Sequence, residues 1–247
     1  MKNKRNSLKP RPQILDYVNV ILLLVFAVIA LFPFYYVFIN SFASYAAVQA
    51  QDIYLIPTSL DLSAYKTIFA DNTFLNAFKV SAFITAAGTL WSLFVSTMTA
   101  YVLSRKDLPG KGLIFTIVLI PMFFSGGLIP FYLQVQRLGL IDSLAALIIP
   151  STINTFYVIL LKNYFDEISP SLEESARIDG ANDLVIFCKI ILPVSKPILA
   201  TVTLFFMVDK WNEYYNAMLF INSQSLKPLQ LMLREVIQNA TFLQSGS

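Results

Sequence analysis

The sequence contains no histidine and a single cysteine, Cys188, and few of its residues are charged. A disulfide within the chain is therefore excluded, and a metal site of histidines and cysteines lacks ligands. A histidine general base and a Ser-His-Asp triad are excluded for the same reason. The sequence also lacks a glycine-rich phosphate loop with lysine and serine or threonine, so we expect a chain that binds no ATP, holds no cofactor and is not an enzyme.

Apolar residues dominate the composition. They make up 56% of the 247 residues, and only 13% are charged, whereas about a quarter of a soluble domain is charged. So much apolar surface cannot be buried in one aqueous core of this length, and the lipid bilayer is its natural solvent. No patch of basic and aromatic residues suggests nucleic acid as a partner.

Five apolar runs are long enough to cross a bilayer, which takes roughly 20 helical residues. The runs are 18–41, 74–104, 113–133, 144–161 and 198–221. They predict an all-α, polytopic membrane protein whose membrane domain spans 18–221. The first run is too long for a cleavable signal peptide. No sixth apolar run occurs in 222–247, so either the protein has five spans or, as we expect, the sequence is truncated before a sixth.

Lysine and arginine are distributed unevenly over the predicted loops. They are concentrated in the N-terminal tail 1–17, in the short loop after the second run and in the long loop 162–197, and the alternate loops hold few. Cytoplasmic loops carry the excess of basic residues. We therefore expect a cytoplasmic N-terminus, a cytoplasmic loop 162–197 and an extracytoplasmic segment 222–247.

The long loop 162–197 has the pattern of two short helices. Ser169 followed by Pro170 is typical of a helix start, and Gly180 ends that helix. A second helix, 184–192, ends before Pro193. Two short helices projecting into the cytosol form a docking device, although helices lying on the lipid headgroups are an alternative.

The capping residues in this loop leave alternatives open. Ser171 and Glu174 offer a capping box one step later than Ser169. Either Asn182 or Asp183 is suited to cap the second helix.

Residues of this loop resemble the EAA motif of ABC importer permeases, which reads E-A-A, three residues, G, nine residues, I-x-L-P. Every spacing matches, and a serine replaces the first alanine; the matching residues are Glu174, Ser175, Ala176, Gly180, Ile190, Leu192 and Pro193. In that family the loop forms coupling helices that sit in a cleft of the cytoplasmic ATPase subunit. The resemblance implies that Glu174, Ala176 and Gly180 belong to that contact.

Further stretches resemble the carbohydrate (MalG-like) permeases, and more narrowly the LplC and YtcP type, which takes oligosaccharides or polysaccharide fragments. These stretches are 124–132, 138–143, Asp179-Gly180-Ala181 and Trp211-Asn212-Glu213. The resemblance extends to about Glu235, where such permeases continue into a sixth helix.

The resemblance also implies an assembly and a location. A second homologous permease, two cytoplasmic ATPase subunits that bind the ATP, and an extracytoplasmic sugar-binding protein would complete the importer. The assembly would lie in the bacterial cytoplasmic membrane and work by alternating access. The competing interpretations are a transporter driven by an ion gradient and a membrane scaffold that docks a cytosolic partner.

Asp209, Lys210 and Glu213 lie about halfway along the fifth run, surrounded by Trp211, Asn212, Tyr214, Tyr215 and Asn216. A charge at mid-bilayer costs about 2.5–3.5 kcal/mol, so these residues should face protein or water. They are candidates for the translocation path, because aromatic rings and carboxylates suit sugars. A structural ion pair or a contact with the partner permease is the first alternative, and an aromatic belt at the outer headgroups is the second.

Ser125-Gly126-Gly127 interrupts the third run. The break would unwind the helix beside the translocation path, as in other transporters, or would only permit close helix packing.

Overall fold

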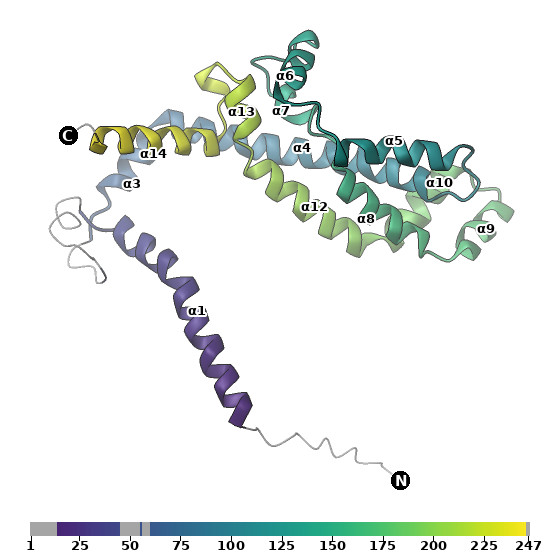
Figure 1. Cartoon of the computed structure of the whole chain (residues 1–247), viewed down its shortest axis with the longest axis horizontal. Coiled ribbons are helices and arrows are strands. Elements are labelled where there is room, and N and C mark those ends of the chain that lie inside the picture. Colours follow the sequence, from purple (N-terminus) through teal and green to yellow (C-terminus); the bar gives the residue numbers. More distant parts are fainter. Residues whose placement is uncertain (1–13, 45–54, 56–59, 246–247) are drawn as a thin grey trace. The chain divides into compact units, whose positions relative to one another are not determined.

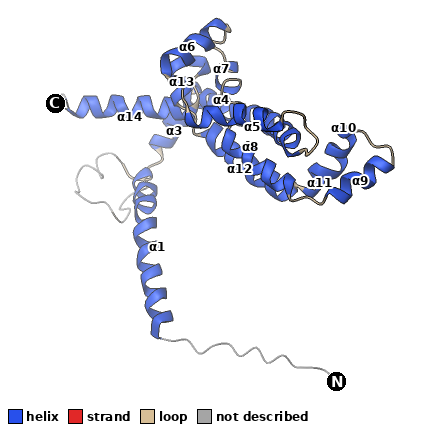
Figure 2. Ribbon diagram, turned by 45° about the vertical axis from the view of Figure 1, so that its right-hand side comes forward, coloured by secondary structure: helices blue, strands red, loops and turns tan. Residues whose placement is uncertain are grey.

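The computed structural model describes residues 14–44, 55 and 60–245, and every regular element in these residues is helical (Figures 1 and 2). The predicted all-α class is therefore confirmed. Most of the basic N-terminal tail, residues 1–13, lies outside the described residues. The chain divides into two units, residues 1–71 and 72–247.

The first unit is built on α1 (Ile14–Ser41), a 28-residue helix that contains Pro33 and buries none of its side chains. A helix that is apolar on all sides needs lipid or protein around it. The short helix α3 (Ser63–Ala70) packs on its C-terminal end. Tyr65 donates a hydrogen bond to the Ser41 hydroxyl at 2.8 Å, and its ring stacks on Phe42 with centroids 5.4 Å apart.

The second unit is built around α4 (Asn72–Ser104), which has 33 residues. Against it pack α8 (Thr155–Asp166) and α12 (Lys196–Trp211). The buried side of α4 carries small residues, among them Ser81, Thr85, Gly88, Thr89, Ser92, Ser96 and Thr97. Small side chains let membrane helices approach closely, so this side of α4 sets how tightly the unit packs.

Lys210 of α12 fills the space beside Gly88 of α4. Its side chain is buried, with 4% exposed. Its ammonium donates to the carbonyls of Leu147 and Ser151, both at 3.2 Å, and to the Ser151 hydroxyl at 2.5 Å. One lysine of α12 therefore contacts α4, α7 (Ala145–Ile148) and the segment that follows α7.

The third, fourth and fifth apolar runs do not form continuous helices. The third consists of α5 (Lys111–Phe123) and α6 (Leu128–Arg137), which are bent by 116°. The fourth divides into α7 and α8 near Pro150, which has no N–H to continue the helical ladder. The fifth divides into α12 and α13 (Tyr215–Phe220). Each of these three predicted spans is therefore interrupted by a break in the helical backbone.

Within the part of the chain that the structure describes, two helices, α1 and α4, are long and apolar enough to cross a membrane. There are up to four spans if each of two bent pairs is one span, the pairs being α5 with α6 and 183–194 with α12. The count of five spans, the boundaries of the membrane domain and the position of the N-terminus stay predictions.

The segment after residue 221, which we expected to be polar and extracytoplasmic, packs on the second unit. The 3-10 turn Gln224–Leu226 leads into α14 (Leu229–Ser245), where Leu229 and Leu231 are buried. The backbone N–H of Leu229 donates to the Ser81 hydroxyl at 2.8 Å. Asn76 of α4 donates to the carbonyl of Ser225 at 2.6 Å. Residues 222–245 are thus tied to α4.

Asp142 fixes the start of this segment. Its carboxylate accepts hydrogen bonds from the backbone N–H groups of Asn222 and Ser223, at 2.9 and 2.8 Å, and from the Ser223 hydroxyl at 2.5 Å. The side-chain hydrogen bond from Ser223 and the two backbone bonds hold the pKa of Asp142 below its ordinary value. Asp142 adopts a φ of 57°, which is unfavourable for most side chains.

We predict that Gly88→Val destabilises the protein. An added Cβ would lie 3.1–3.3 Å from the Lys210 stem, whose ammonium is held by three hydrogen bonds, so helix and lysine must separate. Overpacking of this kind costs about 1–3 kcal/mol. The measurement is the thermal unfolding midpoint of the detergent-solubilised chain. Gly112→Val in α5, where an added Cβ meets nothing within 4 Å, is the control, and an equal midpoint for the two variants would contradict the prediction.

Candidate functional site

We define the docking loop as residues 169–195. It contains α9 (Pro170–Ile178), α10 (Asp183–Ile186), the π-helix η1 (Phe187–Ile191) and α11 (Leu192–Val194). The first helix begins at Pro170, as predicted, with Ser169 at the N-cap position. The Ser169 hydroxyl bonds to the Ser171 hydroxyl at 2.8 Å instead of to the helix backbone.

The turn between the two helices of the docking loop requires Gly180. Its φ of 79° is the left-handed conformation that only glycine adopts without strain. The N–H of Gly180 bonds to the Arg177 carbonyl at 3.0 Å, and that of Ala181 to the Ala176 carbonyl at 2.9 Å. These two bonds are the Schellman motif that ends helices. Asn182 then caps α10 by accepting from the N–H of Val185 at 2.9 Å.

The second helix differs from its prediction. Instead of one helix over 184–192, the chain forms α10, a π-helical turn and α11, which ends at Val194, beyond Pro193. Proline has no N–H to donate to the preceding turn, and π-helical turns often lie at functional sites. The segment then bends by 83° into α12.

The motif residues divide between two sides of the docking loop. Ala176 is buried in the apolar cluster that contains Tyr101 of α4, and Ala181, Ile190 and Leu192 pack against this cluster. The exposed motif residues are Glu174, Ser175, Asp179, Gly180 and Pro193. Ala176 therefore packs within this chain, and a partner would meet the exposed group.

Several apolar side chains at the surface of the docking loop were not expected from the sequence. Ile178 is 87% exposed, Leu184 is 65% exposed and Leu172 is 43% exposed, and Val185 and Val194 are also exposed. An apolar residue on the polar side of a short amphipathic helix was the available signal. Ile178 follows Glu174 by one helical turn, so these two exposed side chains share a face of α9.

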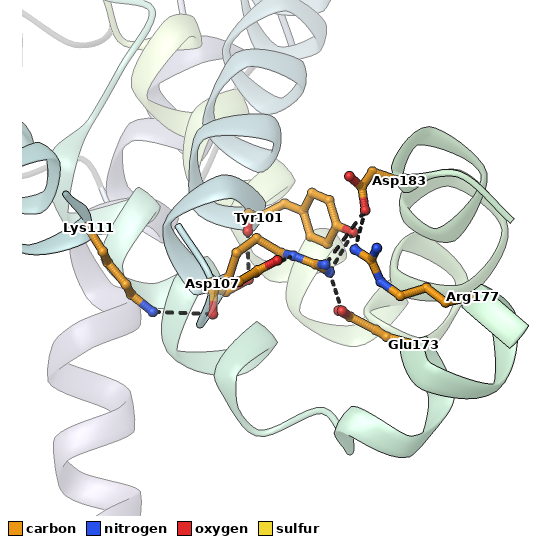
Figure 3. A network of polar contacts seen from close by, with 8 residues as sticks. Tyr101, Asp107, Lys111, Glu173, Arg177 and Asp183 are labelled. Carbon is orange, nitrogen blue, oxygen red and sulfur yellow. Dashed lines mark hydrogen bonds and ion pairs between the residues drawn. The ribbon is translucent and has the colours of Figure 1, made fainter. Parts of the chain in front are cut away.

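A network around Arg105 joins the docking loop to the end of α4, and Figure 3 shows its partners Tyr101, Glu173 and Asp183. The guanidinium donates to the carboxylate of Glu173 in α9 and to the Tyr101 hydroxyl, at 3.1 Å for the latter. Its other terminal nitrogen lies 3.6 Å from Asp183 of α10. Arg177 pairs with the same Asp183 carboxylate at 2.5 Å.

The electrostatic environment of Arg105 keeps its charge in place. Desolvation by burial would lower the pKa of the guanidinium, but Tyr101, Glu173, Asp107 and Asp183 act in the opposite direction, and the pKa lies above its ordinary value. In the sequence, Arg105 is distinguished only as one of the basic residues of the short loop after the second run. Its contact with Glu173 cannot be read from helical periodicity, because the two residues are 68 positions apart.

Two hollows bring together residues predicted for the translocation path. The larger, of about 540 Å³, is lined by Ser125, Gly126 and Gly127 at the break between α5 and α6, and by Phe131 and Tyr215. Residues of the break therefore border this hollow together with Tyr215, so the third and fifth apolar runs meet at one place. Their assignment to a translocation path stays a prediction.

The smaller hollow, of about 270 Å³, is lined by Asp209, Lys210 and Glu213 with Ser151, Ile153, Asn154 and Phe206. Tyr157 donates to the Asp209 carboxylate at 2.8 Å. The Glu213 carboxylate accepts from the backbone and side-chain nitrogens of Asn216, both at 2.9 Å, and so caps α13. Among the described residues Lys210 makes no ion pair with either carboxylate, because its ammonium is turned to Leu147 and Ser151.

Trp211 and Asn212 line neither of these two hollows. The Trp211 ring packs edge-on against Phe78 of α4 with centroids 5.9 Å apart. The Asn212 side chain donates to the carbonyl of Val208 at 2.9 Å, at the end of α12. Both residues therefore serve packing and helix termination in this chain.

The chain resembles transport proteins of known kind. Residues 88–243 match the family described as the inner membrane component of binding-protein-dependent transport systems. The polygalacturonan/rhamnogalacturonan transport system permease protein YtcP of Bacillus subtilis is 47% identical over 215 residues, which cover 87% of this chain and 75% of YtcP. Protein LplC of the same organism is 41% identical over 224 residues, covering 91% and 76%.

A solved structure shares the fold. A chain of a bacterial ABC transporter involved in the import of the acidic polysaccharide alginate superimposes with a TM-score of 0.88 and 38% identity, over 92% of this chain and 82% of that one. The family match covers both the docking loop and the residues around the smaller hollow. This chain therefore belongs to the family of inner membrane components of binding-protein-dependent transport systems, and it is a permease component and not an enzyme.

Proposed function

We propose that this permease moves oligosaccharides released from polysaccharides across the bacterial cytoplasmic membrane, driven by a separate ATPase that docks on residues 169–195. The observation that carries the proposal is the docking loop. A complete EAA spacing folds into two short helices whose exposed side presents Glu174, Ile178 and Leu184 to a partner. YtcP and the alginate importer are named for transport of polysaccharides, which supports the substrate class.

The docking loop is connected to the hollows by the continuous polypeptide chain. It continues through the 83° bend into α12, and α12 carries Asp209, whose carboxylate borders the smaller hollow. A displacement of the loop by the ATPase would therefore tilt α12 and change the shape of that hollow. Rigid elements that pivot about a bend are a recurrent means of opening a site to alternate sides.

The groups that line the hollows suit a saccharide. Carboxylate oxygens of Asp209 and the amide of Asn154 can bind sugar hydroxyls, and the rings of Phe131 and Tyr215 can cover apolar sugar faces. We propose that both hollows form part of the translocation path, together with surface from a second, homologous permease. Two cytoplasmic ATPase subunits and an extracytoplasmic sugar-binding protein complete the importer, with the N-terminus of this chain in the cytoplasm.

We expect Glu174→Arg to weaken docking of the ATPase. The carboxylate is exposed on the partner-facing side of α9, so a reversed charge there opposes any cationic group of the partner without disturbing the core of this chain. The measurement is co-purification of the ATPase subunit with the permease pair and ATP hydrolysis stimulated by binding protein and substrate. Glu167→Arg, at an exposed position outside the motif, is the matched control.

Unchanged ATPase binding in Glu174→Arg would contradict the proposed docking. If Glu174→Arg binds the ATPase and supports uptake as the unmodified chain does, the motif is incidental. Uptake that survives depletion of ATP but stops with an uncoupler would then identify a transporter driven by an ion gradient.

Asp209→Asn should lower saccharide uptake while the complex still assembles. The substitution keeps the shape of the side chain and removes the charge that the smaller hollow presents. A hydrogen bond to a charged group contributes about 1.5–3 kcal/mol, which corresponds to a loss of roughly tenfold or more in uptake. The assay is uptake of labelled neutral oligosaccharides, whose hydroxyls can donate to this carboxylate, into proteoliposomes, with Glu167→Gln as the control. Normal uptake by Asp209→Asn would remove this hollow from the path.

A further inference from the structure

The docking loop is tied to α4 by one guanidinium in addition to apolar contacts. Arg105 directly follows the last residue of α4, and its side chain is only 14% exposed. It contacts Glu173 in the first docking helix and Asp183 in the second. The planar fork of arginine presents its donors in fixed directions, whereas the ammonium of lysine is a point charge on a flexible stem.

Tyr101 of α4 also fixes the position of the Arg105 guanidinium. The Tyr101 hydroxyl accepts from the same guanidinium at 3.1 Å, and the guanidinium carbon lies 5.4 Å from the centre of the Tyr101 ring. That ring packs on Phe187 of η1 with centroids 4.9 Å apart. Figure 3 shows Tyr101, Glu173 and Asp183 gathered around one point between α4 and the loop. The arginine is therefore held from the α4 side as well as from the loop side.

The apolar contacts alone would not fix the direction of the loop. Ala176, Phe187 and Leu103 lie in one buried cluster, and apolar burial depends on area and not on orientation. Hydrogen bonds from a rigid fork do depend on orientation. The apolar cluster holds the loop against α4, and the Arg105 bonds determine the angle at which it is held.

The docking loop has two connections through which a movement could reach the membrane helices. One route is the covalent bend before α12, and a bend of this kind can flex. The other route is through Arg105 to α4, and α4 and α12 pack on each other along their buried sides. If both routes are intact, a movement of the loop reaches both helices together, and their packing is preserved while they move.

We propose that Arg105 is a positioning residue for transport, which locks the docking loop to α4 so that the two move as one body when the ATPase works. This inference rests on the proposed function. Loss of Arg105 would leave the ATPase docked and active, because the partner-facing residues are untouched. The loop would turn without carrying α4 with it, so ATP would be hydrolysed without import.

The test uses the whole importer in proteoliposomes, with labelled polygalacturonan oligosaccharides as the probe. Arg105→Gln should retain the ATPase subunit and its hydrolysis, while uptake falls so that the ATP consumed per saccharide rises about tenfold or more. Arg105→Lys should give an intermediate ratio. Lys106→Gln, an adjacent exposed cation, should match the unmodified complex. A ratio unchanged in Arg105→Gln would overturn the inference.

A second set of variants guards against misfolding of Arg105→Gln. Glu173→Gln removes one partner and should raise the same ratio, and the double variant Arg105→Gln/Glu173→Gln should be no worse than Arg105→Gln alone, because both changes break the same bond. Additive losses would contradict a shared role. If the unmodified complex shows no ATP-driven uptake, the proposed function fails; if it does and the variants stay coupled, only the Arg105 inference fails.

The chain offers a direct probe of the rigid-body step that needs no substrate. Cys188, the only cysteine, is exposed on the docking loop. A second spin label at Leu90→Cys would lie on the exposed side of α4, roughly 20 Å along the helix from its end. The distance between the labels should be the same with and without trapped ATP in the otherwise unmodified chain. It should change or broaden with Arg105→Gln, and an unchanged narrow distance there would overturn the inference.

Discussion

The contact of Lys210 with Gly88 determines much of the second unit. A buried ammonium is tolerated in a membrane protein only where its donors find acceptors, and here the acceptors are the Leu147 carbonyl and the Ser151 carbonyl and hydroxyl. The break between α7 and α8 thus serves the lysine, and the lysine holds α12 against α4. Because successive helical residues point about 100° apart, turning Lys210 inward leaves the neighbouring Asp209 at the hollow.

The interruptions of the apolar runs and the hollows occur at the same places. Irregular backbone at membrane depth is tolerated only where protein buries it or where it borders a water-filled space. Gly126 and Gly127 between α5 and α6 line the larger hollow, and Ser151, after the break at α7, lines the smaller one. The breaks between these helices therefore supply part of the lining of the two hollows. A set of five unbroken apolar helices would present little to a sugar.

The sequence predicted the helical class, the start of α9 at Pro170 and the turn at Gly180, because each depends on local chemistry. It predicted the break in the third run from Ser125-Gly126-Gly127. It did not predict the breaks in the fourth and fifth runs, since hydropathy measures composition over a window and is insensitive to local backbone geometry. The helix α14 was missed because its packing on α4 depends on Ser81 and Asn76, far away in the chain. The role of Arg105 was missed for the same reason.

The docking loop is a short helical segment whose inner and outer sides have different contacts. Its motif has an inward part, with Ala176, Ile190 and Leu192 at the apolar cluster, and an outward part that includes Glu174. A helix as short as α9 has little stability of its own, so force applied to its outer side would unravel it unless its inner side is anchored. Apolar burial resists lifting of the loop, and the bonds from Arg105 resist its rotation. The two kinds of contact are therefore complementary, because neither alone would hold a lever in a fixed direction.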